Sequence, residues 1–209
     1  MTPALQALQR LRDGNGRFAS DEHGRFLGLD PNRRQELTSG QTPFAAILSC
    51  ADSRVPPEIV FDQGLGDLFI IRVAGNIITP VSAGSIELAA AELGTRLVVV
   101  LGHSSCSAVT TALRELTRPT LTLSHNFGRV IDHMRPALTG LPWPSEPAKQ
   151  RETVRHGVRA NVETAVTRLT QISPLLEHLM HEDDLLIVGA EYNLETGIVD
   201  FFHQVPANE

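Results

Sequence analysis

Four short runs of apolar residues, spaced along the chain by segments of helical character, restrict the folds that this sequence can adopt. The runs occupy residues 44–48, 68–73, 97–101 and 185–189. Each has the length of a strand and lacks the polar–apolar alternation of a strand that is exposed on one face. Strands buried on both faces belong to parallel sheets that helices cover on each side. The sequence therefore predicts an α/β fold around a central, mostly parallel β-sheet of four strands, flanked by helices.

The segments around these runs complete the predicted architecture. Helical patterns and stop signals predict helices at residues 3–19, 82–93, 107–116 and 152–172, with short helices at 33–38 and after Pro174. The proline-rich stretch 119–147 is predicted to be irregular, as is the rest of 24–40. A turn at 193–197 and a return strand at 198–203 add one antiparallel edge strand.

Nothing in the sequence divides the chain into parts. It contains no repeat, low-complexity tract or linker, so its 209 residues are expected to form one domain, 1–209, with an N-terminal helical arm at about 1–35. The arm carries Leu5, Leu8, Leu11 and Phe18 near helical spacing. A compact α/β core offers this apolar stripe no obvious partner. The N-terminal helix is therefore expected to pack on a partner subunit.

Charge and composition limit the partners of the chain. A net charge of −6 argues against nucleic acid or an anionic membrane, and 5% aromatic residues offer few platforms for stacking bases. The sequence shows neither an N-terminal signal pattern nor an apolar run long enough to span a bilayer, so a cytoplasmic location is expected. In that reducing compartment the two cysteines are expected to be ligands or catalysts rather than a disulfide.

Both cysteines come soon after an apolar run. Cys50 follows the first run, and His103 and Cys106 follow the third. Because parallel strands end at the same edge of a sheet, these distant residues are expected to converge on one crevice. Two thiolates and an imidazole form a tetrahedral zinc shell with one position left over, as in catalytic zinc sites. Amide groups at the start of the following helix would favour the thiolate of Cys106.

Asp52 and Arg54 determine how the fourth position is used. Asp52 is near enough to Cys50 to reach either the metal or a metal-bound water. If Asp52 binds zinc, the site is closed; if Arg54 pairs with Asp52, water takes the position and its pKa falls to about 7. Two other interpretations of these residues stay open. The cysteines could be buried core residues, or the zinc could be structural, although structural zinc usually takes four Cys or His ligands.

These residues, together with others along nearly the whole chain, resemble the β-class carbonic anhydrases. The resemblance rests on residues 8–15, 40–43, 50–54, 62–67, 72–76, 84–87 and 102–106. It implies one zinc ion per subunit, bound by Cys50, His103 and Cys106, with Asp52 and Arg54 as the catalytic pair. It also implies the reversible hydration of carbon dioxide to bicarbonate and a proton through zinc-bound hydroxide.

The resemblance further implies assembly. Family members are dimers or higher assemblies in which the N-terminal helix wraps the partner, so a homodimer or a dimer of dimers (a homotetramer) is expected. In plant-like members a glutamine at the position of Gln41 reaches into a neighbouring subunit's site and binds substrate. Without the resemblance, Gln41 would be interpreted as a polar loop residue.

Three positions depart from the family pattern. Ser107 stands where a glycine usually follows the second cysteine, and Leu88 stands where plant-like members have a pocket tyrosine. A regulated subtype binds bicarbonate at a second site with Trp, Arg and Tyr. Arg72 and Tyr192 match two of these residues, but Ile47 replaces the tryptophan. The sequence therefore favours the unregulated subtype, with an accessible zinc position at neutral pH.

Two other functions are compatible with the same ligands. Carbonyl sulfide or carbon disulfide hydrolases resemble this family closely, and their metal ligands do not separate them from carbonic anhydrases. A non-catalytic zinc-binding relative is the alternative from a different class, although such a protein would not need Asp52 and Arg54. The remaining histidines are scattered along the sequence, and none is singled out as a proton shuttle.

Overall fold

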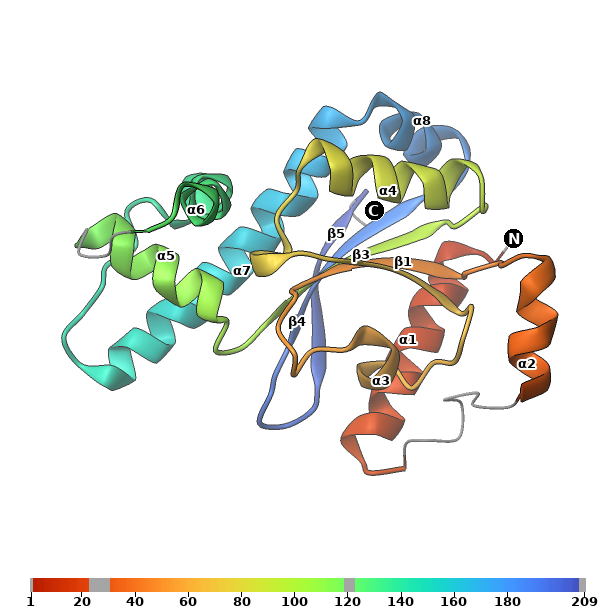
Figure 1. The fold of residues 1–209 in the computed structure, drawn as a ribbon, viewed down its shortest axis with the longest axis horizontal. Helices are drawn as coiled ribbons and strands as arrows, with labels where there is room; N and C mark the ends of the chain where they lie inside the picture. The colour runs from red at the N-terminus through yellow and green to blue at the C-terminus, as the bar shows by residue number, and fades with distance from the viewer. Residues whose placement is uncertain (1, 23–30, 119–122, 207–209) are drawn as a thin grey trace.

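Strands of one sheet form the centre of the computed structural model, which describes residues 2–22, 31–118 and 123–206 (Figure 1). The strands are β1 (Ala45–Ser49), β2 (Leu68–Arg72), β3 (Leu97–His103), β4 (Leu186–Tyr192) and β5 (Val199–Val205). Their order across the sheet is β2-β1-β3-β4-β5. The first four run parallel, and β5 pairs antiparallel with β4 at the edge. The predicted sheet of four parallel strands plus one antiparallel edge strand is confirmed.

The strand order creates a crevice between β1 and β3. The chain leaves β1 for β2 on one side and later adds β3 on the other side. Ser49, the last residue of β1, lies opposite Arg72 of β2 and Leu101 of β3. In open α/β sheets, ligands bind outside the carboxyl ends of strands where the strand order reverses in this way. The topology therefore places a binding crevice at the ends of β1 and β3.

Helices cover both faces of the sheet. One face carries α4 (Pro80–Ala91), α7 (Pro147–Ile172) and α8 (Pro174–Glu182), and the other carries α1 (Ala4–Ala19) and α3 (Pro57–Val60) (Figure 1). Ile47 and Val99 pack on the α1 side, whereas Leu48 and Val100 pack on the α4 and α7 side. All four are fully buried. This two-sided burial explains why the strands are apolar throughout.

The N-terminal helix α1 packs against its own sheet. Ala4, Ala7, Leu8 and Leu11 are buried in the same cluster as residues of β1, β3 and β4. Their spacing forms one helical stripe that covers a sheet face left free by α4, α7 and α8. The expectation that the predicted stripe has no apolar partner within its own chain is therefore wrong for Leu8, Leu11 and Phe18, whereas Leu5 is 66% exposed. Packing of α1 on a partner subunit stays a prediction.

A buried asparagine connects α1 to the edge strand β5 through hydrogen bonds. The Asn15 amide donates to the carbonyl oxygens of Val60, at 3.1 Å, and Gly197, at 2.8 Å. Its side-chain oxygen accepts from the backbone amide of Val199 at 2.8 Å. Because the Asn15 side chain is buried, each of these bonds replaces a contact with water that folding removes. These bonds join the N-terminal helix to the turn and strand of the β4–β5 hairpin.

The segment predicted to be irregular contains a helix. α6 (His125–Leu138) begins after Ser124, whose hydroxyl accepts a hydrogen bond from the amide of Phe127 at 3.3 Å. Ile131, Met134 and Leu138 form its buried face and pack with residues of α5 (Ser107–Thr117) and α7. The prediction of an irregular segment relied on its prolines, but the apolar residues at helical spacing form a helix that includes Pro136 in its last turn. Residues 119–122 of that segment lie outside the described residues.

The remaining elements are short. α2 (Pro31–Glu36) and the 3₁₀ turn Leu37–Ser39 occupy the position of the predicted short helix, and residues 23–30 before them lie outside the described residues. The prediction missed α3 and a second 3₁₀ turn, Ala74–Asn76, which follows β2. Among the helices that the structure describes, none combines the length and apolarity needed to cross a bilayer.

Candidate metal centre

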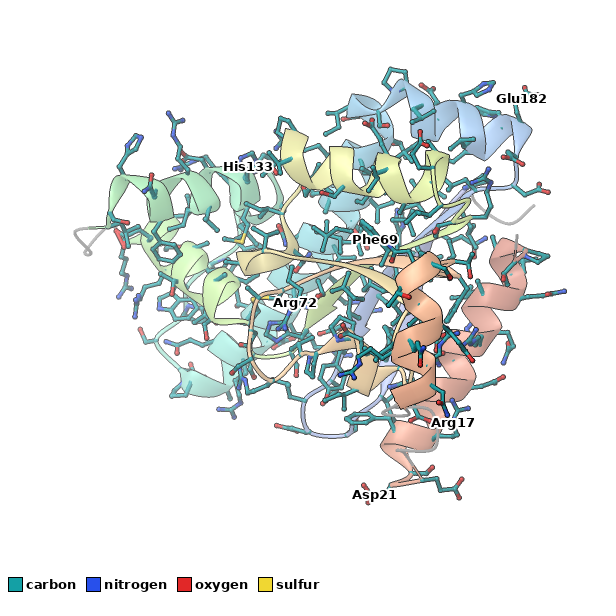
Figure 2. All side chains as sticks on the ribbon, turned by 45° about the vertical axis from the view of Figure 1, so that its right-hand side comes forward. Arg17, Asp21, Phe69, Arg72, His133 and Glu182 are labelled. Carbon is teal, nitrogen blue, oxygen red and sulfur yellow. The ribbon has the colours of Figure 1, made fainter. Side chains whose placement is uncertain are left out.

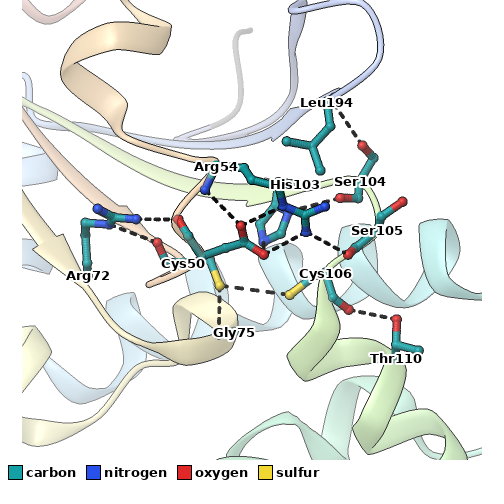
Figure 3. Close-up of polar contacts among 11 residues, drawn as sticks. Cys50, Arg54, Arg72, Gly75, His103, Ser104, Ser105, Cys106, Thr110 and Leu194 are labelled. Carbon is teal, nitrogen blue, oxygen red and sulfur yellow. Dashed lines mark hydrogen bonds and ion pairs between the residues drawn. The ribbon is translucent and has the colours of Figure 1, made fainter.

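Cys50, His103 and Cys106 converge at the crevice between β1 and β3 (Figure 3). Cys50 directly follows β1, His103 ends β3, and Cys106 immediately precedes α5. One ligand atom from each residue lies within 4.8 Å of the other two, and the two sulfur atoms are 4.0 Å apart. All three side chains are buried. The structure thus brings together the three residues that the sequence predicted as metal ligands.

The His103 ring is oriented as a metal ligand. Its Nδ1 lies 3.0 Å from the carbonyl oxygen of Ser104, which can only accept a hydrogen bond. Nδ1 therefore carries the proton, and Nε2 keeps its lone pair. Nε2 is buried and has no hydrogen-bond partner among the described residues. An unsatisfied buried acceptor costs about 1–3 kcal/mol, and a zinc ion between the three residues would satisfy this one.

The two thiols share their protons unequally. The hydrogen bond from Cys106 lowers the pKa of Cys50, against the opposing effect of burial. The same bond raises the pKa of Cys106, because its proton is held by the neighbouring thiolate. The pair therefore loses one proton readily and holds the second. A dication between the sulfurs favours loss of both protons, since a coordinating thiol is deprotonated.

The 3₁₀ turn after β2 donates a hydrogen bond to the sulfur of Cys50. The backbone amide of Gly75 donates to the Cys50 sulfur at 3.4 Å, and the Asn161 amide of α7 donates to the Gly75 carbonyl at 2.8 Å. Gly75 has φ +71°, and a Cβ there would lie 2.7 Å from the sulfur of Met134. Only glycine meets both conditions without strain. Asn161 and Gly75 thus orient a metal ligand without touching the metal position.

Asp52 lies beside the metal position and is held by Arg54. Arg54 Nε donates to Asp52 Oδ1 at 2.9 Å, and Nη2 donates to Oδ2 at 2.8 Å, in a bidentate pair. These bonds hold the pKa of Asp52 well below its usual range, against the opposing effect of burial. Oδ2 is 3.9 Å from Nε2 of His103. The carboxylate therefore adjoins the metal position while its charge is paired with a guanidinium.

Arg72 has a positioning role that the sequence analysis missed. It ends β2, beside β1 (Figure 2), and its guanidinium lies against the turn after Cys50 (Figure 3). Nε donates to the Cys50 carbonyl at 3.1 Å, and Nη2 donates to the Asp52 carbonyl. One side chain thus fixes the backbone of a metal ligand and of its acidic neighbour. A charged residue at the end of an otherwise apolar run was the available signal.

The other residues noted from the sequence lie elsewhere. Gln41 is exposed just before the start of β1, whereas the metal ligands lie at the carboxyl ends of β1 and β3. Leu88 is half exposed on α4, and Ser107 is exposed at the first position of α5. Ile47 is fully buried within β1, and Tyr192 is buried at the end of β4, opposite His103 in the register. None of these joins the cluster of metal ligands within one chain.

The comparisons with known proteins agree on one family. The carbonic anhydrase family profile matches residues 45–199. Carbonic anhydrase 2 of Mycobacterium tuberculosis is 36% identical over 196 residues, covering 94% of this chain and 91% of that protein. Carbonic anhydrase of Mycolicibacterium smegmatis is 35% identical over 206 residues, covering 94% of this chain and 92% of that protein.

The fold is shared with a solved structure. A solved structure from work on two tetrameric β-carbonic anhydrases of Sordaria macrospora aligns with a TM-score of 0.71 at 20% identity. The alignment covers 97% of this chain and 98% of that one, so the two share the fold throughout. The family profile covers β1 to β4 and the first residue of β5, and it includes all three predicted ligands. The chain therefore belongs to the β-class carbonic anhydrases.

Proposed function

We propose that this protein catalyses the reversible hydration of carbon dioxide to bicarbonate and a proton. The observation that carries the proposal is the buried cluster of Cys50, His103 and Cys106, with Nε2 of His103 left without a partner among the described residues. When bound there, zinc would lower the pKa of a coordinated water to about 7 and so supply a nucleophile at neutral pH. The relatives named carbonic anhydrase support this assignment.

Asp52 is proposed to orient the attacking water. Its Oδ1 already accepts two hydrogen bonds, from the backbone amide and Nε of Arg54. Oδ2 accepts one, from Nη2 of Arg54, and is the oxygen that faces His103. A carboxylate oxygen accepts about two hydrogen bonds, so Oδ2 has capacity for one more on the side of the metal position. In this role Oδ2 accepts a hydrogen bond from the water and directs its lone pair toward carbon dioxide.

Arg54 and Arg72 are proposed to keep that carboxylate in place. Arg54 holds its two oxygens, and Arg72 holds the backbone carbonyl of the same residue. Because Asp52 is paired with Arg54, its negative charge is balanced and it is kept from turning into the metal position. This is the open arrangement of the site. A water that enters the site then meets a fixed acceptor, which lowers the entropy cost of orientation.

A stopped-flow assay tests the proposed reaction. The zinc-loaded protein is expected to acidify a buffered carbon dioxide solution at pH 8 far faster than the uncatalysed reaction, with about one zinc per chain. Carbonyl sulfide and carbon disulfide, assayed in parallel by sulfide release, are expected to react much more slowly. Absence of carbon dioxide hydration by zinc-loaded protein would overturn the proposal, and sulfide release in its place would favour the hydrolase alternative.

We also propose that two or more chains assemble. Gln41 lies near the amino end of β1, and the metal ligands lie at the carboxyl ends of the strands. A neighbouring chain is therefore needed to bring Gln41 to a site as a substrate-binding residue. α4 supports a subunit interface because it exposes Val81 at 80% and Leu88 at 50%. Light scattering is expected to give a mass of about two or four times 22.8 kDa. A mass of one chain at micromolar concentration contradicts assembly.

A cytoplasmic location is part of the proposal. Both cysteines belong to the candidate metal cluster, and a reducing compartment would keep them available as ligands. Cell fractionation is the direct check, and recovery of the protein outside the cytoplasmic fraction would contradict it.

A further inference from the structure

A second cavity lies next to the metal centre, on the far side of the turn that follows His103. Its volume is about 560 Å³. Its walls come from the first half of α7, the β4–β5 hairpin and the turn residues Ser104 and Ser105. Figure 1 shows α7 running past this end of the sheet beside β4 and β5. The size is within the range of small-molecule sites, which is roughly 300–1,000 Å³.

Most polar groups in the walls already have partners. Arg159 donates to Glu191 at 3.2 Å and to Asp200 at 2.7 Å, so one guanidinium lies between two carboxylates. The Asn193 side-chain oxygen accepts from the amides of the hairpin turn, and the Ser104 hydroxyl accepts from the amide of Leu194. These hydrogen bonds give the cavity a fixed frame.

Two further cations in the walls form no hydrogen bond or ion pair among the described residues. Arg151 and Arg155 are four residues apart on α7, so both point from the same face of the helix. Within the part of the chain that the structure describes, neither takes part in a hydrogen bond, an ion pair within 4.0 Å or a cation–π contact. Glu195 is the one acid of the walls among the described residues without an ion-pair partner. The three arginines and three acids of the walls balance in formal charge, and Arg155 acts electrostatically on Glu191. Arg151 and Arg155 therefore offer a ligand open N–H donors rather than an excess of positive charge.

An apolar wall faces the same space. Trp143, Pro147, Val154 and Ile198 line the cavity. Trp143 is half-buried and packs against the cluster under α5 and α6. A cavity with two guanidinium groups that have open donors and an aromatic wall suits a ligand with an anionic group and an apolar body.

We propose that this cavity binds a small organic anion, with its carboxylate held by Arg151 and Arg155 and its apolar part against Trp143. Planar guanidinium groups match the two oxygens of a carboxylate in bidentate fashion. The whole chain carries a net charge of −6 and the cavity walls carry no net formal charge, so binding of an anion here depends on the open N–H donors of the two guanidinium groups. Because Ser104 and Ser105 adjoin His103, an occupant would border the metal centre without entering it.

The sequence provides its own probe for this site, since Trp143 is the only tryptophan of the chain. Benzoate, which has a carboxylate and an apolar ring, is the ligand to titrate into the zinc-loaded protein while tryptophan fluorescence is recorded. We expect a saturable change in the emission of Trp143. Benzamide, which has the same ring without the charge, is expected to produce at most a weak, non-saturating change.

Variants separate this site from the metal centre. The double variant R151Q/R155Q is expected to weaken benzoate binding about tenfold or more, because hydrogen bonds to charged groups are lost. K149Q removes an exposed cation of the same helix outside the cavity and is expected to bind as the parent does. Circular dichroism verifies that each variant is folded, and the single variants R151Q and R155Q replace the double one if it is not.

Three results would overturn the proposal: no saturable change with benzoate, equal affinity for benzamide, or equal affinity in the arginine variants. The last result would also point to binding of benzoate at the zinc. The readout is ligand binding, so a failure here leaves the proposed hydration activity intact, and a failure of that activity leaves this inference standing.

Discussion

Replacing Cys106 by Ser is expected to abolish hydration of carbon dioxide and to reduce zinc binding by more than about 100-fold. The hydroxyl of serine does not replace a thiolate as a zinc ligand. Changes to residues that merely orient a ligand already cost about 10–100-fold in metal affinity, so loss of a ligand itself should cost more. Metal analysis after dialysis and stopped-flow kinetics measure the two effects.

The neighbouring residue provides the control for this variant. Ser107 is exposed at the first position of α5, and Ser107→Ala is expected to retain both zinc and activity. The parent protein is also expected to unfold at a lower temperature after a chelator removes zinc, because a bound metal stabilises the folded state. A Cys106→Ser variant that keeps one zinc per chain would show that Cys106 is not a ligand.

Asp52→Asn is expected to lower kcat/KM by about 10²- to 10⁴-fold without releasing zinc, since that range is typical of a positioned acid–base group. The amide has one oxygen in place of two and presents N–H groups to Arg54, so the bidentate pair cannot form. The acceptor that faces His103 is then lost or turned away. Kinetics and metal content are measured on the same preparation.

A second Asp–Arg pair allows a matched comparison. Asp132 pairs with Arg135 at 2.9 Å on the exposed side of α6, and Asp132→Asn is expected to leave kcat/KM unchanged. Exposed pairs of this type contribute about 1 kcal/mol or less to stability. Should Asp52→Asn retain the rate of the parent, the role proposed for Oδ2 would be wrong.

Much of the fold could be predicted because the strands carry a local signal. The apolar runs before Cys50 and His103 are buried on both faces, and this burial leaves a continuous pattern that needs no knowledge of the partner strands. The elements that were missed or misjudged depend on distant contacts. α6 is stabilised by its packing on α5 and α7, and α1 by a sheet face that only the finished topology leaves open.

The site likewise has some features that follow from local sequence and others that depend on distant contacts. Thiol and imidazole groups are recognisable as ligands from their chemistry, and a parallel topology brings the ends of β1 and β3 together. The positions of Cys50, His103 and Cys106 after apolar runs were therefore enough to predict a shared metal site. The role of Arg72 could not be predicted in this way, because it depends on β2 lying next to β1 and on the carbonyls that its guanidinium reaches.

The sequence by itself determined the parallel sheet and the three residues that could hold a metal, because burial pattern and ligand chemistry are properties of short segments. Only the tertiary structure decided that Arg54 holds Asp52 and that two arginines of α7 face a cavity beside the metal centre. It also placed Gln41 at the end of the sheet opposite to the metal ligands. These features depend on the directions of side chains from elements far apart in the chain, and such directions are set by packing rather than by local pattern.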